Sequence, residues 1–260
     1  KWPELDGSVT YLSSNKLTWP SISSSPKDIE DFLRLRSPLS VIPKVIDPEF
    51  LFVQVNSDVR YDPNRTSKSD LDIKTLVVDK IQEFANTNIN KFDTTLRSSQ
   101  LARSIDDADA SILNNDTFIT LKKTINPDLG VANSFVLNFN NKIQQEIPDA
   151  LNQYVDGSAP VQSTAFTFSN LTSCTLRDNG LGTLQIVRQA NGDIQVVENN
   201  IGTVDYEEGV VSINTFEVSS FEGSAITVTT TPSNRTVKSN KNIILSYNQK
   251  PIINIIQERV

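Results

Sequence analysis

Carboxylates are the most numerous reactive groups in this sequence, and two sets of them stand close together. Asp106, Asp107 and Asp109 form the densest acidic cluster, and Glu207 is followed directly by Glu208. Neighbouring side chains diverge on a helix, and the aspartate cluster lacks the alternating ligands and the glycine of a calcium loop. A glycosidase pair needs carboxyl groups roughly 5 to 10 Å apart across a cleft. We therefore interpret both sets as solvated, the first at a helix end and the second at a turn.

Two further motifs have both a functional and a structural interpretation. Gly180-Leu181-Gly182 is similar to part of a phosphate loop, but it lacks the P-loop lysine and the strand-to-helix context, so we predict a turn between strands. Cys174 is the only cysteine, and the sequence has no histidine to activate it, so we expect an inert thiol. A Ser-His-Asp triad, a Cys-His pair and a Cys/His zinc site are excluded for the same reason. We expect no enzyme activity, no cofactor and no metal site.

The composition is typical of a folded soluble protein. The 260 residues are 37% apolar and 21% charged, enough for one large domain or two ordinary ones. The net charge of −7 and a pI near 4.8 disfavour nucleic acid and anionic membrane surfaces as partners. No apolar run approaches the roughly 20 residues of a membrane span. Because Lys1 is preceded by no methionine and followed by no signal-peptide core, we expect a fragment of a longer soluble chain.

Capping signals and apolar periodicity predict three helices in the first half of the chain. Ser25-Pro26-Lys27-Asp28 can begin the first helix. Ser69 and Asp72 have the spacing of a capping box for a second helix that runs to about Asn88, and a third covers roughly 98–109. Alternating apolar residues predict strands at 8–12, 51–61, 92–96 and 112–122. We therefore predict an α+β domain over 1–126, with a ferredoxin-like α/β sandwich layer.

The second half of the chain has the signals of an all-β domain. Residues 127–160 are predicted to be a connecting segment, and 161–260 a β-rich domain. Short runs of Val, Ile, Thr and Phe are separated by turn residues at 178–180, 191–193 and 207–209, which is the spacing of hairpins. We expect a β-sandwich or a small barrel after the α+β layer.

The run Ile252-Ile253-Asn254-Ile255-Ile256 is apolar on both faces of any strand that it forms. Such a run is either a strand buried in the β domain or an adhesive edge that awaits another chain. Ile252, Ile253, Ile255 and Ile256 are therefore our candidate interface residues.

An ordered set of strings is similar to the later part of a known family of virion proteins. The strings are Val45-Ile46-Asp47-Pro48-Glu49-Phe50, Val59-Arg60-Tyr61-Asp62-Pro63-Asn64-Arg65-Thr66, Asn90-Lys91-Phe92, Ser104-Ile105-Asp106-Asp107-Ala108-Asp109-Ala110-Ser111-Ile112, and Gly202-Thr203-Val204-Asp205-Tyr206 followed by Gly209-Val210-Val211. In this order they resemble the baseplate wedge protein of T4-like contractile-tailed bacteriophages, a large relative of the baseplate-J proteins. The resemblance covers most of residues 40 to 215.

The resemblance implies a structural virion protein of the phage tail baseplate, assembled in the bacterial host cytoplasm. Wedge proteins of this kind pair with copies of themselves, as a homodimer within a hexameric ring, and with other wedge proteins, and the ring rearranges on infection. No catalytic residue and no small-molecule substrate come with the resemblance. Two other functions stay open. One is a carbohydrate-binding or adhesin-type β module, although Trp2 and Trp19 lie outside the β domain; the other is a carboxylate hydrolase.

Overall fold

The structure is a computed structural model that describes residues 26–38, 40–45, 47–149, 153–154, 159–190, 192–247 and 250–259. The chain divides into two compact units, Lys1–Glu49 and Phe50–Val260, and each is described by itself. The strand predicted at 8–12, together with Trp2 and Trp19, lies outside the described residues. None of the helices in the described ranges is long and apolar enough to cross a membrane.

The first unit contains the helix α1, Pro26–Arg34, which begins at the proline that the sequence predicted for its first position. Glu30 Oε1 accepts a hydrogen bond from the backbone N–H of Val45 at 2.8 Å. The guanidinium of Arg36 lies 3.9 Å from the ring centre of Phe32. These two contacts hold the segment that follows α1 against the helix.

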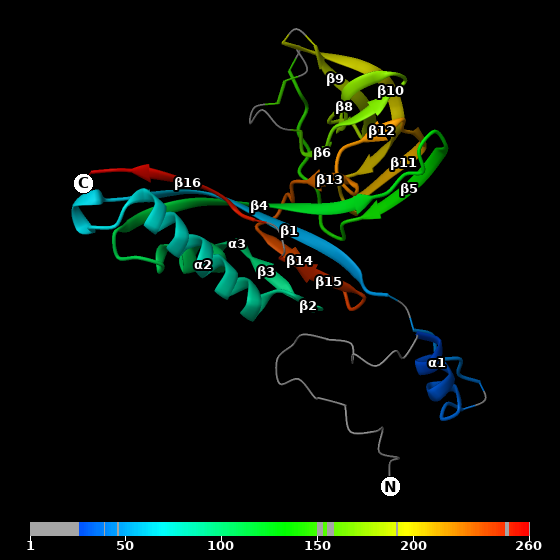
Figure 1. Ribbon diagram of the computed structural model, residues 1–260, viewed down its shortest axis with the longest axis horizontal. Coiled ribbons are helices and arrows are strands. Elements are labelled where there is room, and N and C mark those ends of the chain that lie inside the picture. The colour runs from blue at the N-terminus through cyan, green and yellow to red at the C-terminus, as the bar shows by residue number, and fades with distance from the viewer. Residues whose placement is uncertain are drawn as a thin grey trace. The chain divides into compact units, whose positions relative to one another are not determined.

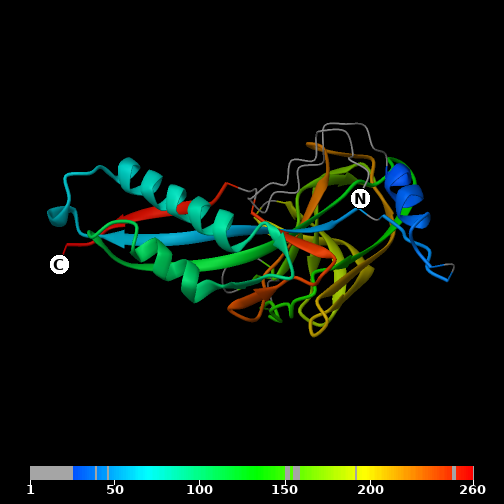
Figure 2. The same ribbon diagram turned by 90° about the horizontal axis from the view of Figure 1, so that it is seen from below.

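The second unit is built on two long antiparallel strands, β1 (Glu49–Tyr61) and β4 (Ile112–Ile125), as Figure 1 shows. Alternate residues of β1, from Leu51 to Tyr61, are buried, and the residues between them are partly exposed. The helices α2 (Asp70–Asn88) and α3 (Ser98–Asp106) cover the buried face. Seen from below in Figure 2, α2 follows the strand β16 (Ile252–Gln257) and α3 follows β4.

The caps of α2 explain where this helix begins. The Ser69 side chain accepts a hydrogen bond from the Asp72 backbone N–H, and the Asp72 carboxylate accepts one from the Ser69 backbone N–H. Ile73, Val77, Ile81 and Ala85 then recur on one face and are buried against the sheet. The predicted capping box and the predicted end near Asn88 are both confirmed.

Short strands from distant parts of the chain complete this helix-covered layer. The strand β2 (Lys91–Phe92) pairs with β15 (Ile243–Ser246), and β3 (Thr95–Arg97) pairs with β14 (Thr236–Lys238). The C-terminal strand β16 pairs in parallel with β1, with Asn56 opposite Ile252 and Arg60 opposite Ile256. The last part of the predicted β domain thus returns to the layer formed by the first half of the unit.

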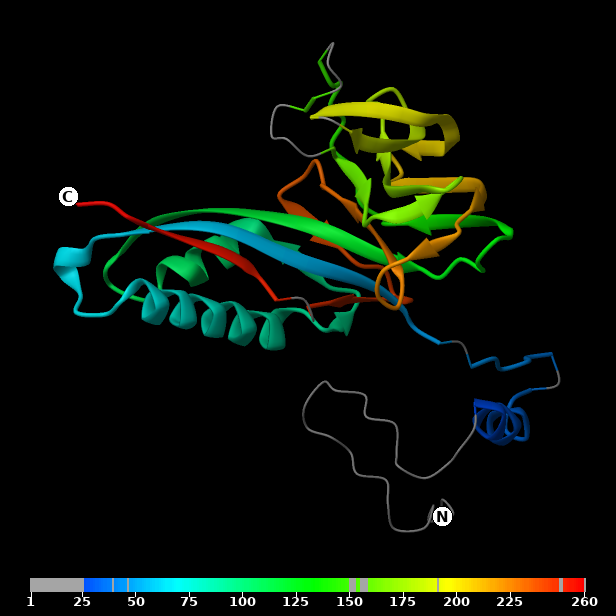
Figure 3. The ribbon, with the colours of Figure 1, turned by 45° about the horizontal axis from the view of Figure 1, so that its top comes forward.

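The remaining strands continue the same sheet from β4 to β13 (Ile226–Thr230) and onward, as Figure 3 shows. The order after β13 is β6, β8, β9, β10, β11 and β5, and each neighbouring pair is antiparallel. Their bounds are β5 Ala132–Asn138, β6 Val161–Ser163, β8 Leu171–Asp178, β9 Thr183–Ala190, β10 Asp193–Asp205 and β11 Val210–Glu217. Two short strands, β7 (Phe166–Phe168) and β12 (Ser220–Phe221), pair with each other beside β8. A short 3₁₀ turn, Pro63–Arg65, follows β1.

The architecture is a mixed α+β fold that is mostly β, and the small barrel that we expected is wrong. Within the described residues the path of the large sheet ends at β2 and β5, which do not pair. To close a barrel from the strands β13 to β5, β5 would have to pair with the edge of β13 that β6 leaves free, and that edge pairs with β4 instead. The predicted hairpins at 178–180 and 207–209 connect β8 to β9 and β10 to β11. The strands β9 and β10 are antiparallel neighbours with Ala190 opposite Asp193, and Asn191 of the turn predicted between them lies outside the described residues. The ferredoxin-like description and the boundaries at 126 and 160 stay predictions.

The strands β10 and β11 come unusually close at Gly202. A Cβ atom at this position would lie 1.9 Å from the carbonyl oxygen of Ser212, which is backbone and cannot move aside. The next residue, Thr203, is exposed. Gly202 is therefore required by the close approach of the two strands.

We expect Gly202→Ala to destabilise the fold by about 1–3 kcal/mol, because the new methyl group forces β10 and β11 apart. Thr203→Ala, one residue later on an exposed position, is the matched control and should change stability by less than about 0.5 kcal/mol. Urea unfolding followed by circular dichroism measures both. Equal stabilities of the two variants would contradict the close approach.

Candidate assembly surface

One face of the sheet formed by β16, β1 and β4 has no helix on it among the described residues of the second unit. The helices lie on the face that carries Leu51 to Tyr61, so the alternate residues form the other side. We call this side the open face. It consists of Ile252, Asn254 and Ile256 of β16, Phe52, Gln54, Asn56, Asp58 and Arg60 of β1, and Asn114, Asp116, Phe118, Thr120 and Lys122 of β4.

The open face carries large apolar side chains that are exposed among the described residues of this unit. Phe118 is 58% exposed and Ile252 is 52% exposed, and the register places both beside Asn56. Ile256, at the end of β16, is also exposed. Exposed apolar groups gathered on one surface are typical of protein–protein contacts. The open face is thus the candidate assembly surface of this unit.

Hydrogen bonds across the strands hold four of the polar residues of the open face in place. Asn254 donates through Nδ2 to Asp58 Oδ1 at 2.8 Å, and Arg60 donates through Nη1 to Asn114 Oδ1 at 3.1 Å. Each bond joins two directly opposed residues of neighbouring strands, and the two bonds lie in adjacent rows of the face. The surface is therefore organised before any partner arrives.

The four candidate interface isoleucines fall on both sides of β16. Ile253 is 2% exposed and Ile255 is half-buried, both on the side of α2. Ile252 and Ile256 are on the open face. The run is a strand at the border of the sheet, with one side packed in this chain and the other exposed.

The three residues of the aspartate cluster have different partners in the structure, and each has a local role. Asp106 accepts a hydrogen bond from Asn115 Nδ2 at 2.7 Å, and Asp107 is the C-cap of α3. Asp109 forms an ion pair with Lys68 and accepts from the Ser111 hydroxyl at 2.6 Å. These bonds to Lys68 and Ser111 lower the pKa of Asp109 to about 2. The cluster therefore fastens the turn between α3 and β4.

Glu207 and Glu208 lie in the tight turn between β10 and β11. Their backbone N–H groups both donate to Asp205 Oδ1 at 3.0 Å, and the Glu207 carboxylate forms an ion pair with Lys142. Gly209 ends the turn in the left-handed region, with φ of 70°. Among the described residues, no group of three or more His, Cys, Asp and Glu side chains could hold a metal ion.

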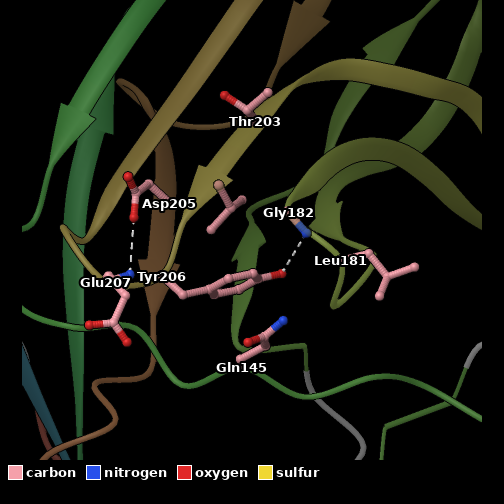
Figure 4. A pocket seen from close by; sticks show the side chains of 8 residues that line it. Gln145, Leu181, Gly182, Thr203, Asp205, Tyr206 and Glu207 are labelled. Atoms are coloured by element: carbon pink, nitrogen blue, oxygen red, sulfur yellow. Dashed lines mark hydrogen bonds between the residues drawn. The ribbon is translucent and has the colours of Figure 1, made fainter.

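A shallow hollow of about 410 Å³ lies beside this turn (Figure 4). Its lining is Gln145, Leu181, Gly182, Thr203, Val204, Asp205, Tyr206 and Glu207. In the close-up, the Tyr206 ring crosses the hollow and its hydroxyl reaches the backbone N–H of Gly182, which donates to it at 3.2 Å. Two of the polar groups drawn there are already bonded to the chain: Asp205 caps the turn, and Tyr206 is held at its hydroxyl.

Tyr206 belongs to a buried polar network centred on Asp178. The Tyr206 hydroxyl donates to Asp178 Oδ2 at 2.9 Å, and the Val161 backbone N–H donates to Oδ1 at 3.1 Å. Tyr154 donates to the backbone carbonyl of Asp178 at 2.7 Å. Burial raises the pKa of the Asp178 carboxyl, and burial together with the Asp178 charge raises the pKa of the Tyr206 hydroxyl. The network joins β8 to β6 and to the β10–β11 turn.

Sequence reasoning did not find this network. Asp178 was identified only as a turn residue, and Tyr206 only as part of a string. The signal that was present is an aspartate and a tyrosine at the ends of predicted strands, which is too common to single out a buried pair.

Cys174 and the Gly180–Gly182 turn have the structural roles that the sequence predicted. Cys174 is fully buried and free, its Sγ lies 3.3 Å from the Leu171 carbonyl oxygen, and burial raises the pKa of its thiol. Gly180 and Gly182 both have positive φ in the turn between β8 and β9.

We expect Tyr206→Phe to destabilise the fold by about 1–3 kcal/mol at pH 7, because the buried Asp178 carboxylate loses a donor. The bond to Tyr206 lowers the pKa of Asp178 against the raising effect of burial, so its loss raises that pKa further. A carboxyl whose pKa is raised on folding loses stability as the pH rises above its unfolded value of 3.8. The destabilisation should therefore be smaller near pH 4 than at pH 7.

Tyr247→Phe is the matched control for this substitution. The Tyr247 hydroxyl is also buried, and it has no hydrogen-bond partner among the described residues. Its removal should leave stability unchanged or slightly increased. Urea unfolding at pH 4 and pH 7 compares the two variants, and equal losses in both would contradict the network.

We expect Asp109→Asn to destabilise the fold by about 1–2 kcal/mol at pH 7, a value reduced because the Lys68 side chain is 45% exposed. A carboxyl with a lowered pKa contributes fully above its unfolded value of 3.8, and its contribution is lost as the pH falls through about 2. The difference from the unsubstituted chain should therefore shrink between pH 4 and pH 2. Asp107→Asn, on the exposed neighbour, is the control, and a pH-independent loss in Asp109→Asn would refute the assignment.

Two comparisons with known proteins agree with each other. Residues 49–124, which run from β1 to β4, match the family model described as "Baseplate structural protein gp6, C-terminal domain III". Over 213 residues the chain is 21% identical to the baseplate wedge protein gp6 of Enterobacteria phage T4. The aligned residues cover 73% of this chain and 31% of that protein. The chain thus spans about a third of the length of the curated relative that it matches.

The ordered strings had predicted this relationship from the sequence, and the match from β1 to β4 places it on the layer that carries the open face. The chain is therefore similar, over these residues, to a baseplate wedge protein of a T4-like phage.

Proposed function

We propose that this chain is a structural component of the tail baseplate wedge of a T4-like phage, located in the virion. It self-associates and binds other wedge proteins, and the ring that they build rearranges on infection. The observation that carries this proposal is the similarity to the baseplate wedge protein gp6 over 73% of the chain.

The geometry supports a role in assembly. The residues that match the family model form β1, α2, α3 and β4, and two of these strands supply most of the open face. A stable protein–protein contact needs about 800 Å² on each partner, with apolar groups at its centre. The open face, with Phe118, Ile252 and Ile256 exposed on a three-stranded surface, provides such groups.

The chain's reactive groups support a structural role as well. Asp109 and Glu207, from the two acidic sets, are each paired with a lysine. Beside the hollow, Asp205 accepts from the backbone of its own turn, and the Tyr206 hydroxyl accepts from the Gly182 backbone N–H in the turn between β8 and β9. We infer that these residues fix strand ends and turns, and that the protein works without catalysis.

Ile252 and Ile256 are the exposed isoleucines of the candidate interface, and we expect their joint replacement by lysine to weaken self-association at least tenfold. The two lysines place like charges in a contact that is otherwise apolar. Sedimentation velocity over a concentration series measures the dimer, first alone and then with a second wedge protein.

The control is the pair Leu71→Lys and Leu181→Lys, which changes two leucines outside the open face that are more exposed than Ile252 and Ile256. This variant should associate like the unsubstituted chain. The reverse result would move the contact away from β16, and a chain that neither self-associates nor binds a wedge protein would refute the proposal.

A further inference from the structure

The strand β16 lies at the border of the sheet with one of its edges unpaired. It pairs with β1 on one side, and within the described residues no strand pairs with its other side. Alternate residues of such a strand direct their backbone N–H and C=O groups outward, where they can bind another strand. Natural edges are usually guarded by charged residues or proline within the strand. The six residues of β16, Ile252–Gln257, include neither.

We propose that β16 of a second copy of this chain pairs antiparallel with this edge about a twofold axis, with Asn254 opposite Asn254 of the second copy. The proposal rests on the self-association proposed above, and it names the contact that makes the dimer. The two sheets then become one continuous sheet across the dimer.

The residues Ile252–Ile256 of β16 are a palindrome, because they have the same order in both directions from Asn254. This symmetry selects the register. With Asn254 on the axis, Ile252 lies opposite Ile256 of the second copy, and Ile253 lies opposite Ile255. Moving the axis by one residue in either direction leaves a single isoleucine opposite its own copy and places the others against proline, asparagine, glutamine or charged residues. Directly opposed apolar side chains stabilise an antiparallel pair, so the register centred on Asn254 is favoured over its neighbours.

The charged residues that flank the palindrome obey the same symmetry. In the register centred on Asn254, Lys250 lies opposite Glu258 of the second copy, and the twofold axis repeats this pair at the other end. Both side chains are exposed, and neither takes part in the ion pairs of the described residues. An isologous contact needs this self-complementarity in both shape and charge.

The edge is also held in place before any second copy arrives. Ile253 is buried under α2, Gln257 donates through Nε2 to Asp70 Oδ1 at 2.8 Å, and the Glu258 backbone N–H donates to the Tyr61 carbonyl at 2.9 Å. A strand that is fixed at its centre and at one end loses little conformational freedom when it pairs.

A charge exchange in the 260-residue chain tests the register. Lys250→Glu alone and Glu258→Lys alone should each raise the dimer dissociation constant about tenfold, because two attractive pairs become repulsive. The double variant Lys250→Glu, Glu258→Lys restores opposite charges across the axis, so its dissociation constant should return to within about twofold of the unsubstituted value. Sedimentation equilibrium measures all four proteins.

A disulfide tests the same geometry without relying on charge. Directly opposed residues of antiparallel strands have Cα atoms about 4.5–5.5 Å apart, within the range that a disulfide spans. Asn254→Cys should therefore form a covalent dimer on mild oxidation, since Cys174 is fully buried. Asn114→Cys, on the open face of β4, is the control: it should form no covalent dimer under the same conditions, because edge pairing keeps the two β4 strands apart.

The outcomes separate this proposal from the one on which it rests. Restoration by the double variant together with cross-linking at residue 254 supports edge pairing. If the dimer dissociation constant is the same in all the charge variants, or if the dimer cross-links at residue 114 instead, edge pairing is wrong and self-association is still supported. A chain that is monomeric at every concentration overturns both.

Discussion

The antiparallel pairing of β1 with β4 is the interaction on which the rest of the unit Phe50–Val260 depends. Leu121 and Lys122 of β4 face β1 on one side and β13 on the other, so one strand belongs to both halves of the sheet. Its apolar residues must then serve the core under α2 and α3 as well as the core of the following strands. The small-barrel prediction failed at this point. Because β13 pairs with β4 on one edge and with β6 on the other, it has no free edge with which β5, the last strand of the path, could close a barrel.

The same pairing decides which surface is left for assembly. A strand directs successive side chains to opposite faces, so covering Leu51, Val53 and Val55 with α2 and α3 leaves Phe52, Gln54 and Asn56 on the other side. The open face is thus a direct consequence of the alternation in β1. Its polar residues are fixed by bonds such as Asn254 to Asp58, while Phe118 and Ile252 stay exposed. A face that is ordered and apolar in patches is well suited to bind another protein surface, because little freedom is lost on binding.

The parts of the fold that local signals encode could be predicted from the sequence. The capping box of Ser69 and Asp72 placed the start of α2, and the alternation from residue 51 to 61 predicted β1. The pairing of β16 with β1 could not be predicted, because Ile252 to Ile256 is apolar on both faces and nearly 200 residues separate the partners. A strand without alternation gives no signal for which face is buried. The Asp178–Tyr206 network was missed for a related reason: whether a carboxylate is buried depends on strands that meet only after folding.

An apolar edge strand carries a risk that its symmetry can contain. Any exposed edge can recruit strands without limit, and head-to-tail contacts that do not close build fibres. Pairing about a twofold axis leaves no β16 edge free in either copy, so assembly through this edge stops at the dimer. The flanking charges add selectivity, since registers that shift Lys250 away from Glu258 lose the opposite charges as well as the contacts between isoleucines. The same five residues therefore provide the attraction, and their palindromic order together with Lys250 and Glu258 limits that attraction to one closed contact.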